Sequence, residues 1–165
     1  PEGAALQDFI SILRRRGWTG ELWIIPSLVQ GKEAPAQLLK GIAMVAEIPG
    51  LELLVLARGG GSIEDLWAFN DETLVRAVAG CPLPTISAIG HQTDFVLSDF
   101  AADLRAETPS AAAEWISSRY LELMERLRQL TDGLGKAPRE FLGRAGDRLA
   151  VLAARMEKEI GRAHV

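Results

Sequence analysis

The sequence predicts an α/β fold with an open parallel sheet, helices on both faces and a C-terminal helical arm. Short apolar runs of strand length alternate three times with segments of helical spacing, and parallel strands need such helical crossovers. Beyond residue 109 the alternation stops, and apolar residues recur every seven positions, as in coiled coils. We therefore expect an α/β domain over residues 1–108 and a helical coiled-coil arm over residues 109–165.

The individual elements follow from hydrophobic periodicity and from start and stop signals. Predicted helices span residues 3–16, 34–48, 63–69 and 73–79, and predicted buried strands span residues 21–26, 53–57 and 85–89. Ser62 is suited to cap the third helix, and Asn70 or Asp71 the fourth, because their side-chain oxygens can accept backbone N–H groups. From Phe95 to Pro109 the sequence is irregular. This order of elements is Rossmann-like, and it places ligands at the carboxyl ends of the strands.

The predicted arm begins with a helix for which Ser110 is the expected cap. Apolar residues at heptad spacing then form two seams of shifted phase. The first seam contains Ile116, Tyr120, Leu123, Leu127, Leu130 and Leu134, and the second contains Leu142, Leu149 and Met156. Gly133, Gly135 and Pro138 separate the seams, which fits either a kink or a hairpin turn. Each seam is short, so the arm is expected to need a partner or to fold back on itself.

The composition limits the classes of protein to consider. With 165 residues and 48% hydrophobic content, the chain can bury a core in one domain plus an appendage. Residues 1–110 hold 8 basic and 14 acidic side chains, which argues against avid nonspecific binding of nucleic acid by this part. Cys81 is the only cysteine, and no apolar stretch approaches the ~20 residues of a membrane span. Both features suit a cytoplasmic protein that does not bind a membrane.

The run RGGGS, over residues 58–62, is typical of an anion site. It joins a buried strand to a predicted helix, so glycine amides can converge where no Cβ obstructs them. Arg58 adds a permanent charge and a planar set of donors. The candidate phosphate-binding residues are Gly59, Gly60, Gly61 and Ser62. The alternative is a tight turn between strand and helix that carries a surface arginine.

A second polar loop, GHQTD over residues 90–94, follows the predicted strand over residues 85–89. If the strands are parallel, His91 leaves the sheet at the same edge as Arg58. His91 could then activate water or protonate the leaving oxygen of a phosphodiester, while Arg58 and the glycine amides stabilise the developing charge. Asp94 would hold the imidazole in one tautomer. The structural alternatives are a histidine without a catalytic role and an aspartate that caps the next helix.

Metal catalysis is the competing interpretation of the same region. His91, Asp94, Asp99 and Asp103 are close in sequence, and nucleases with two metal ions hold them with carboxylate clusters. Asp99 and Asp103 flank a short apolar run, however, which is typical of a helix with solvated acids. No pair of residues has a recognised metal-ligand spacing, so we assign no metal ligand. A non-catalytic module that binds phosphate or a nucleotide is a third possibility.

Two tryptophans could stack on nucleic-acid bases. Core packing is the favoured interpretation for both. Trp67 lies in the apolar run LWAF, and Trp115 adjoins the first seam of the arm.

Three segments closely resemble the large subunit of bacterial exonuclease VII. They are GAALQDFI over residues 3–10, ARGGGSIEDLWAFNDE over residues 57–72, and ISAIGHQTDFVLSDFAADLRAETPSAAAE over residues 86–114. The likeness runs from Pro1 to about Arg119, and the arm resembles that family's C-terminal region by pattern. The resemblance implies a catalytic domain without the family's N-terminal OB-fold and without the strand expected before Pro1. Gln92 stands where the family usually has glutamate, and Glu107 where it has proline.

The resemblance implies an exonuclease that degrades single-stranded DNA from both the 5′ and 3′ ends to short oligonucleotides, with no required divalent metal or other cofactor. The family's functional residues match at Asp8, Arg58, His91 and Asp94, which become the candidate catalytic residues. Asp8 enters only through this match, because spacing alone makes it a surface acid. The resemblance also implies several copies of a helical small subunit, for which the arm is the expected binding surface. Without an OB-fold, weak DNA binding is expected.

Overall fold

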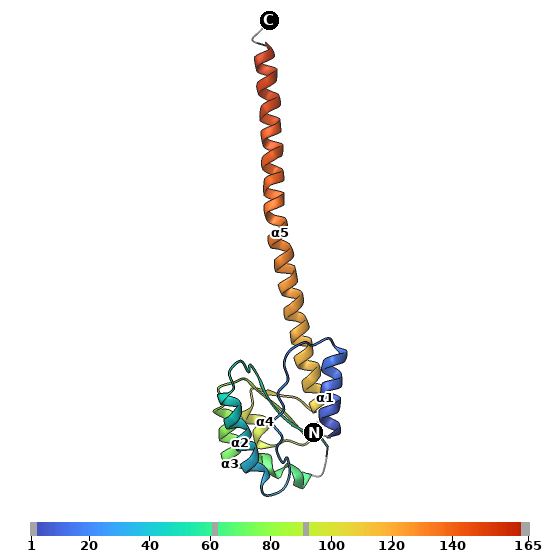
Figure 1. The fold of residues 1–165 in the computed structure, drawn as a ribbon, viewed down its shortest axis with the longest axis vertical. Coiled ribbons are helices and arrows are strands. Elements are labelled where there is room, and N and C mark those ends of the chain that lie inside the picture. Colours follow the sequence, from blue (N-terminus) through green and yellow to red (C-terminus); the bar gives the residue numbers. More distant parts are fainter. Residues whose placement is uncertain (1–2, 61–62, 91–92, 163–165) are drawn as a thin grey trace. The chain divides into compact units, whose positions relative to one another are not determined.

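The computed structural model describes residues 3–60, 63–90 and 93–162. Its three-stranded parallel sheet has the strand order β1-β2-β3, with β1 over Leu54–Arg58, β2 over Thr85–Ile89 and β3 over Leu104–Arg105. The helices are α1 (Ala4–Arg15), α2 (Ala34–Glu47), the 3-10 helix η1 (Ile63–Asn70), α3 (Glu72–Ala79), α4 (Leu97–Ala101) and α5 (Pro109–Arg162) (Figure 1). The predicted parallel α/β fold is thus confirmed.

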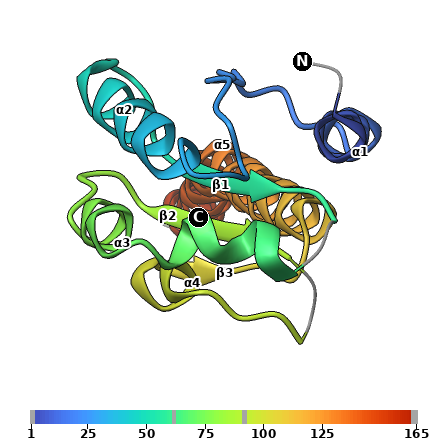
Figure 2. The same ribbon diagram turned by 90° about the horizontal axis from the view of Figure 1, so that it is seen from below.

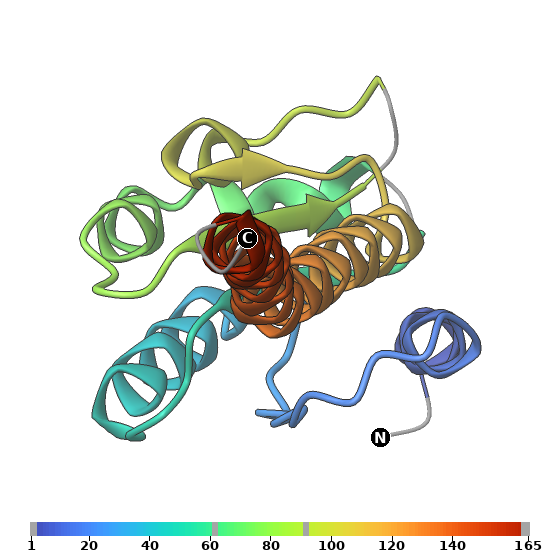
Figure 3. The same cartoon turned by 90° about the horizontal axis from the view of Figure 1, so that it is seen from above.

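The chain divides into two compact units, Pro1–Tyr120 and Leu121–Val165. In the first unit, helices cover both faces of the sheet (Figure 2, Figure 3). Leu56 and Ile89 pack on one face into a core with α2, α3, η1 and the segment that leads into α4. Ile86 and Ala88 pack on the other face into a core with α1 and the first turns of α5. Because successive strand residues point to opposite faces, both β1 and β2 contribute to both cores.

Helix α1 lies beside the first turns of α5 (Figure 1). Two polar contacts join the end of α1 and the following residues to α5. Arg16 Nη2 donates to Ser118 Oγ at 2.7 Å, and the hydroxyls of Thr19 and Tyr120 share a hydrogen bond of 2.6 Å. These contacts fix the position of the helix that carries Asp8.

The predicted strand over residues 21–26 is wrong. Residues 21–29 form neither helix nor strand, and none of the three described strands pairs with them. Leu22, Trp23 and Ile24 are exposed. An apolar run becomes a strand only where a neighbouring strand completes its backbone hydrogen bonds, and here residues 21–26 pair with none of the three described strands.

The expectation of an irregular chain from Phe95 to Pro109 is also wrong, because this region contains α4 and β3. Strand β3 pairs in parallel with β2 through Ile86 with Leu104 and Ser87 with Arg105. A helix of five residues and a strand of two are too short to show a hydrophobic period, so tertiary contacts specify both.

The predicted helix starts are confirmed at α3 and corrected at α5. Asp71 caps α3, because its Oδ1 accepts the N–H of Leu74 at 3.0 Å. At α5 the capping side chain is Thr108 rather than Ser110, since Thr108 Oγ1 accepts the N–H of Ala111 at 3.1 Å. Pro109 occupies the first turn, where its missing N–H needs no partner.

The second unit is the greater part of α5. The helix continues through Gly133 and Pro138, so the structure shows no hairpin turn there. The apolar side chains of both predicted seams that fall in this unit are exposed: Leu123, Leu127, Leu130, Leu134, Leu142, Leu149 and Met156. Among the described helices, none combines the length and the apolar content needed to span a membrane.

Asp103, which precedes β3, fixes the start of β2. Its Oδ2 accepts the N–H of Thr85 at 2.8 Å and the Thr85 hydroxyl at 2.9 Å. These two bonds hold the pKa of Asp103 below its ordinary value of 3.8, and the bond from the Thr85 backbone has the larger effect. A carboxylate with a lowered pKa in the folded state stabilises the fold above its ordinary pKa, and this contribution is lost as the pH falls through the lowered value.

We therefore expect Asp103→Asn to unfold at a lower urea concentration than the wild type at pH 7, and the difference to shrink as the pH falls below about 4. Urea melts followed by circular dichroism from pH 7 to pH 3 measure it. Asp132→Asn, which changes an exposed carboxylate of the arm, is the control and should shift little. If the difference in urea midpoint between Asp103→Asn and the wild type stayed constant from pH 7 to pH 3, the stabilising role of the ionised Asp103 side chain would be contradicted.

Candidate active site

Strands β1 and β2 end level with each other, because Arg58 pairs with Ile89 in the parallel register. Gly59 and Gly90 follow these partners, so the two polar loops begin side by side at the carboxyl edge of the sheet, as the parallel arrangement predicts. Gly90 has a φ of +84°, a left-handed conformation that favours glycine. Four predicted or discussed positions of these loops lie outside the described residues: Gly61, Ser62, His91 and Gln92.

Arg58 is buried, with 4% of its surface exposed, so the alternative of a surface arginine is wrong. Its Nη2 donates to Oδ2 of Asp65 on η1 at 3.1 Å. Among the described residues, its buried Nη1 has no hydrogen-bond partner. A buried donor without a partner costs roughly 1–3 kcal/mol, and more when it is charged. An anion that accepted a hydrogen bond from Nη1 would remove this penalty.

The first glycine of the turn lies against α1. A Cβ placed on Gly59 would come within 3.1 Å of the Cβ of Ala5, closer than ordinary van der Waals contact. The absence of a side chain at Gly59 therefore lets the first turn of α1 reach the carboxyl edge of the sheet. Gly60 continues the turn beyond this contact.

Asp8 lies one turn after Ala5 on the same side of α1. Its side chain is exposed and borders a shallow hollow, whose other lining residues are Ser11, Ile12, Arg15 and Ser110. The structure therefore places Asp8 on the helix that contacts the glycine turn, one turn away from that contact.

Gly90 and Asp94, which follow β2, lie against each other. A Cβ placed on Gly90 would lie 3.3 Å from the Cβ of Asp94, so the start and the end of the loop are in close contact. Asp94 is half-buried, and Thr93 Oγ1 donates to its Oδ1 at 3.3 Å. Asp94 thus lies next to the first residue after β2, at the same edge as Arg58.

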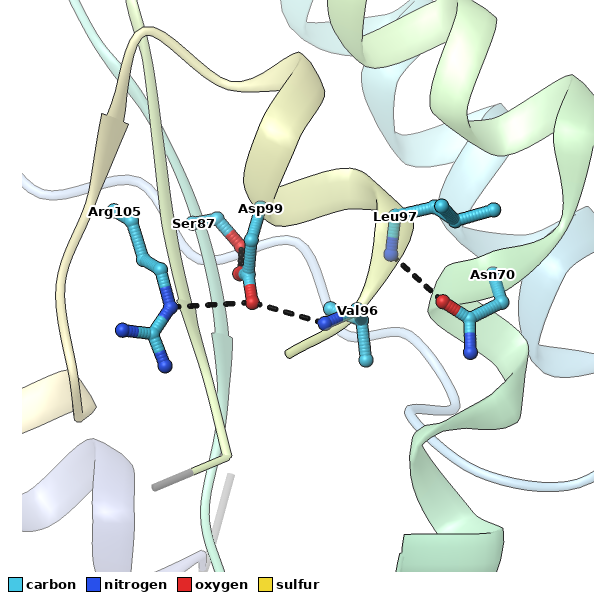
Figure 4. Close-up of polar contacts among 6 residues, drawn as sticks. All are labelled: Asn70, Ser87, Val96, Leu97, Asp99 and Arg105. Carbon is cyan, nitrogen blue, oxygen red and sulfur yellow. Dashed lines mark hydrogen bonds and ion pairs between the residues drawn. The ribbon is translucent and has the colours of Figure 1, made fainter. Parts of the chain in front are cut away.

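Two hydrogen bonds anchor the end of this loop (Figure 4). The N–H of Val96 donates to Asp99 Oδ2 at 3.1 Å, and the N–H of Leu97 donates to Asn70 Oδ1 at 2.7 Å. Asn70 ends η1, and Asp99 is the third residue of α4. The segment that carries Asp94 is therefore fixed to the same short helix that holds Arg58 through Asp65.

Asp99 is a buried carboxylate rather than the solvated acid that its sequence context predicts. Besides the N–H of Val96, it accepts the hydroxyl of Ser87 at 2.5 Å and Nε of Arg105 at 3.3 Å (Figure 4). A buried charge is tolerated when hydrogen bonds and a counter-ion satisfy it. Asp99 therefore ties β2, β3 and the loop end together, which no local pattern could indicate.

The carboxylates of the alternative metal cluster do not converge. Asp99 is engaged by Arg105, and Asp103 by Thr85 at the beginning of β2. Asp94 lies beyond the other end of β2, a strand of five residues that spans roughly 13 Å between its first and last Cα. Within residues 3–60, 63–90 and 93–162, no three His, Cys, Asp or Glu side chains are grouped to hold a metal ion.

The core packing favoured for two tryptophans is wrong. Trp67 is 73% exposed although Leu66, Ala68 and Phe69 beside it are buried, and Trp115 is 40% exposed. In the 3-10 helix η1 the buried residues face one side, and Trp67 points to the other.

Comparison with known proteins identifies the family. A family model described as "Exonuclease VII, large subunit" matches residues 1–164. The chain belongs to the exonuclease VII large-subunit family. The resemblance inferred from three motifs is thus confirmed, and the match to this family also includes the arm.

Relatives named exodeoxyribonuclease 7 large subunit are 45% identical in Brevibacillus brevis, 54% in Alcanivorax borkumensis and 51% in Pseudomonas aeruginosa, over 152, 127 and 134 residues. These matches cover 92%, 77% and 81% of this chain and 33%, 28% and 28% of the relatives. The chain therefore spans about a third of the length of the exonuclease VII large subunits that it matches.

Sequence reasoning missed the residues that hold the site in place. Asp65 lies in the first turn of the helix predicted over residues 63–69, where local patterning assigns a carboxylate no role beyond favouring the helix start, and Asn70 was expected only to cap the next helix. The structure shows instead that they fix Arg58 and the end of the second loop. The one local signal for Asp65 is its distance of seven residues from Arg58 across a glycine turn, which is short enough to bring the two charges together.

Proposed function

We propose that this chain carries the phosphodiester-cleaving site of an exonuclease that degrades single-stranded DNA from both ends to short oligonucleotides, without an essential divalent metal. Membership of the exonuclease VII large-subunit family supports nuclease activity. The observation that carries the proposal is Arg58, a buried guanidinium at the carboxyl edge whose Nη2 binds Asp65 and whose Nη1 has no partner among the described residues. A phosphate oxygen is a suitable acceptor for such a group, because guanidinium donors match phosphate geometry.

In the proposed reaction, water attacks phosphorus, and the bond from phosphorus to the leaving oxygen breaks. His91 takes the proton of the attacking water or gives a proton to the leaving oxygen. Asp94 holds the imidazole of His91 in one tautomer. Arg58 and the amides of Gly59–Ser62 stabilise the negative charge on the phosphorane. The support for this division of roles is that Arg58 ends β1 and Asp94 lies against the first residue after β2, and that the two strands end at the same edge.

Asp8 is proposed as a further active-site residue on the strength of the family motif. Its support from the structure is its place on α1, one turn from the contact between Ala5 and Gly59. The Arg16 and Ser118 contact holds α1 in this position.

The proposed activity is tested with single-stranded oligonucleotides labelled at the 5′ end or, separately, at the 3′ end. The chain is assayed in excess EDTA, alone and with the family's small subunit. We expect short labelled products from both substrates, and their loss in His91→Ala. Cleavage that stops in EDTA and returns with Mg²⁺ would instead indicate a metal-dependent phosphohydrolase, and binding without cleavage would indicate a phosphate-binding module.

We also propose that the exposed seam of the second unit binds the family's helical small subunit. Leu123 and Leu130, two turns apart on α5, are exposed although leucine at heptad spacing is typical of helix interfaces. We expect the double change Leu123→Glu and Leu130→Glu to abolish co-purification of the small subunit. Gln129→Glu, at an exposed polar position between them, should leave it intact. Co-purification that persists in the double variant would reject this surface.

A further inference from the structure

An exposed aromatic patch lies directly beside the candidate site. Phe95 is 57% exposed and Phe100 is 75% exposed. Their rings stack with centroids 6.0 Å apart and an interplanar angle of 28°. Leu97, between them in sequence, is also exposed. Such a cluster of large apolar side chains in solvent, within six consecutive residues, indicates a binding surface.

A fixed arginine borders this patch. The guanidinium carbon of Arg105 lies 4.1 Å from the centroid of the Phe95 ring, which is a cation–π contact. Nε of Arg105 also donates to Asp99, whose carboxylate is buried (Figure 4). Two contacts therefore hold the Arg105 guanidinium in one orientation: the hydrogen bond to Asp99 and the Phe95 ring against its flat face.

The patch is also fixed relative to the candidate site. Phe95 directly follows Asp94 in the chain, and Val96 and Leu97 are anchored through their N–H groups to Asp99 and Asn70. The Phe95 ring therefore lies one residue from the side chain proposed to orient the catalytic imidazole. Arg58 and the contact between Gly90 and Asp94 lie at the same edge of the sheet, so a strand of nucleic acid whose phosphate reached Arg58 would reach the edge at which the segment carrying Phe95 begins.

We propose that Phe95 and Phe100 form a stacking platform for a base of the single-stranded substrate, next to the scissile phosphate. The inference rests on the proposed function. The net charge of this region favours recognition of a base over a purely electrostatic contact with the strand. Residues 1–110 hold 14 acidic and 8 basic side chains, so neutralisation of phosphates alone would bind a strand only weakly. Stacking on an aromatic ring holds any base, because every base has a π face. A non-specific exonuclease needs this property.

The test distinguishes binding to the bases of a strand from binding to its sugar-phosphate backbone. Two fluorescein-labelled, hydrolysis-resistant strands of twelve nucleotides are compared by anisotropy, one of thymidines and one of abasic sites, both with phosphorothioate linkages. We expect the wild-type chain to bind the thymidine strand about tenfold more tightly than the abasic strand. Phe100→Ala should lose this preference and bind the abasic strand as the wild type does. Phe100→Trp should retain it, because it keeps an aromatic face.

Phe141→Ala is the matched control, since Phe141 is similarly exposed but belongs to the second unit. It should behave as the wild type. Phe100→Ala removes an exposed side chain, so its thermal melt should not change. The proposal is overturned if Phe100→Ala weakens the binding of both strands equally or of neither. It is also overturned if the substitution changes only the oligomeric state measured by light scattering, which would indicate a protein contact. Hydrolysis of unmodified strands by the wild type is scored separately, so failure of the activity and failure of the platform are distinguished.

Discussion

Replacing Arg58 by alanine is expected to lower the rate of single-strand cleavage at least about 100-fold. Arg58 ends β1 at the carboxyl edge, and Asp65 fixes its guanidinium through Nη2. Its buried Nη1 has no hydrogen-bond partner among the described residues, so it can donate to a phosphate oxygen that reaches it. A preorganised donor of this kind acts mainly on the charge that develops in the transition state, so the loss should appear in kcat more than in KM. Steady-state kinetics with a fluorescent single-stranded oligonucleotide measure both.

Two further variants interpret that result. Arg58→Lys keeps the charge but loses the planar set of donors, and it should remain impaired. Arg76→Ala removes an exposed arginine that also pairs with a carboxylate, Glu72, and it should cleave at the wild-type rate. Circular dichroism melts report whether each variant is folded. A folded Arg58→Ala variant with wild-type kcat would remove Arg58 from the mechanism.

Asp94→Asn is expected to lower turnover by roughly 100-fold as well. The amide has nearly the same shape as the carboxylate, so the contact between Gly90 and residue 94 should persist. What changes is the ability to fix the imidazole of His91 in the required tautomer and to stabilise its protonated form. Single-turnover cleavage of a labelled oligonucleotide measures the chemical step directly.

The matched control is Asp71→Asn, because Asp71 caps α3 and asparagine caps helices about equally well. It should cleave at the wild-type rate. The proposed role of Asp94 would be rejected if Asp94→Asn were as fast as Asp71→Asn in single-turnover measurements.

The parts of the fold that sequence could predict are those with a local cause. β1 and β2 were predictable because each is a short apolar run between turn residues, and each follows a helix, α2 or α3, that shows helical spacing of its apolar residues. Asp71 was predictable as a cap because a single side chain explains it. The carboxyl ends of parallel strands lie at one edge of a sheet. Predicting β1 and β2 was therefore enough to predict that the loops after Arg58 and Ile89 begin at the same edge.

The remaining features depend on contacts between distant residues. The run over residues 21–26 has strand composition, but a strand needs a partner and this run pairs with none of the described strands. Strand β3 consists of two residues that pair with β2, and Asp99 is buried only because Ser87 and Arg105 satisfy it. The exposure of Trp67 depends on which side of η1 faces the core, which the apolar run LWAF does not reveal.

The candidate site likewise combines features that local sequence predicts with features that depend on contacts between distant residues. Arg58 was predicted at the correct edge, but its burial and its pairing with Asp65 come from the way η1 folds back over the end of β1. Asp8 required the family motif, because an exposed acid on an amphipathic helix carries no signal of its own. The aromatic surface of Phe95 and Phe100 lies in the segment that local patterns described as irregular.

The most direct test of the whole account is a crystal structure of Asp94→Asn bound to a short single-stranded oligonucleotide. The account predicts one phosphate within hydrogen-bond distance of Arg58 Nη1 and of the amides after β1, at the carboxyl edge of the sheet. A strand that binds only elsewhere, with the Arg58 guanidinium still enclosed by protein and out of reach of any phosphate, would contradict it.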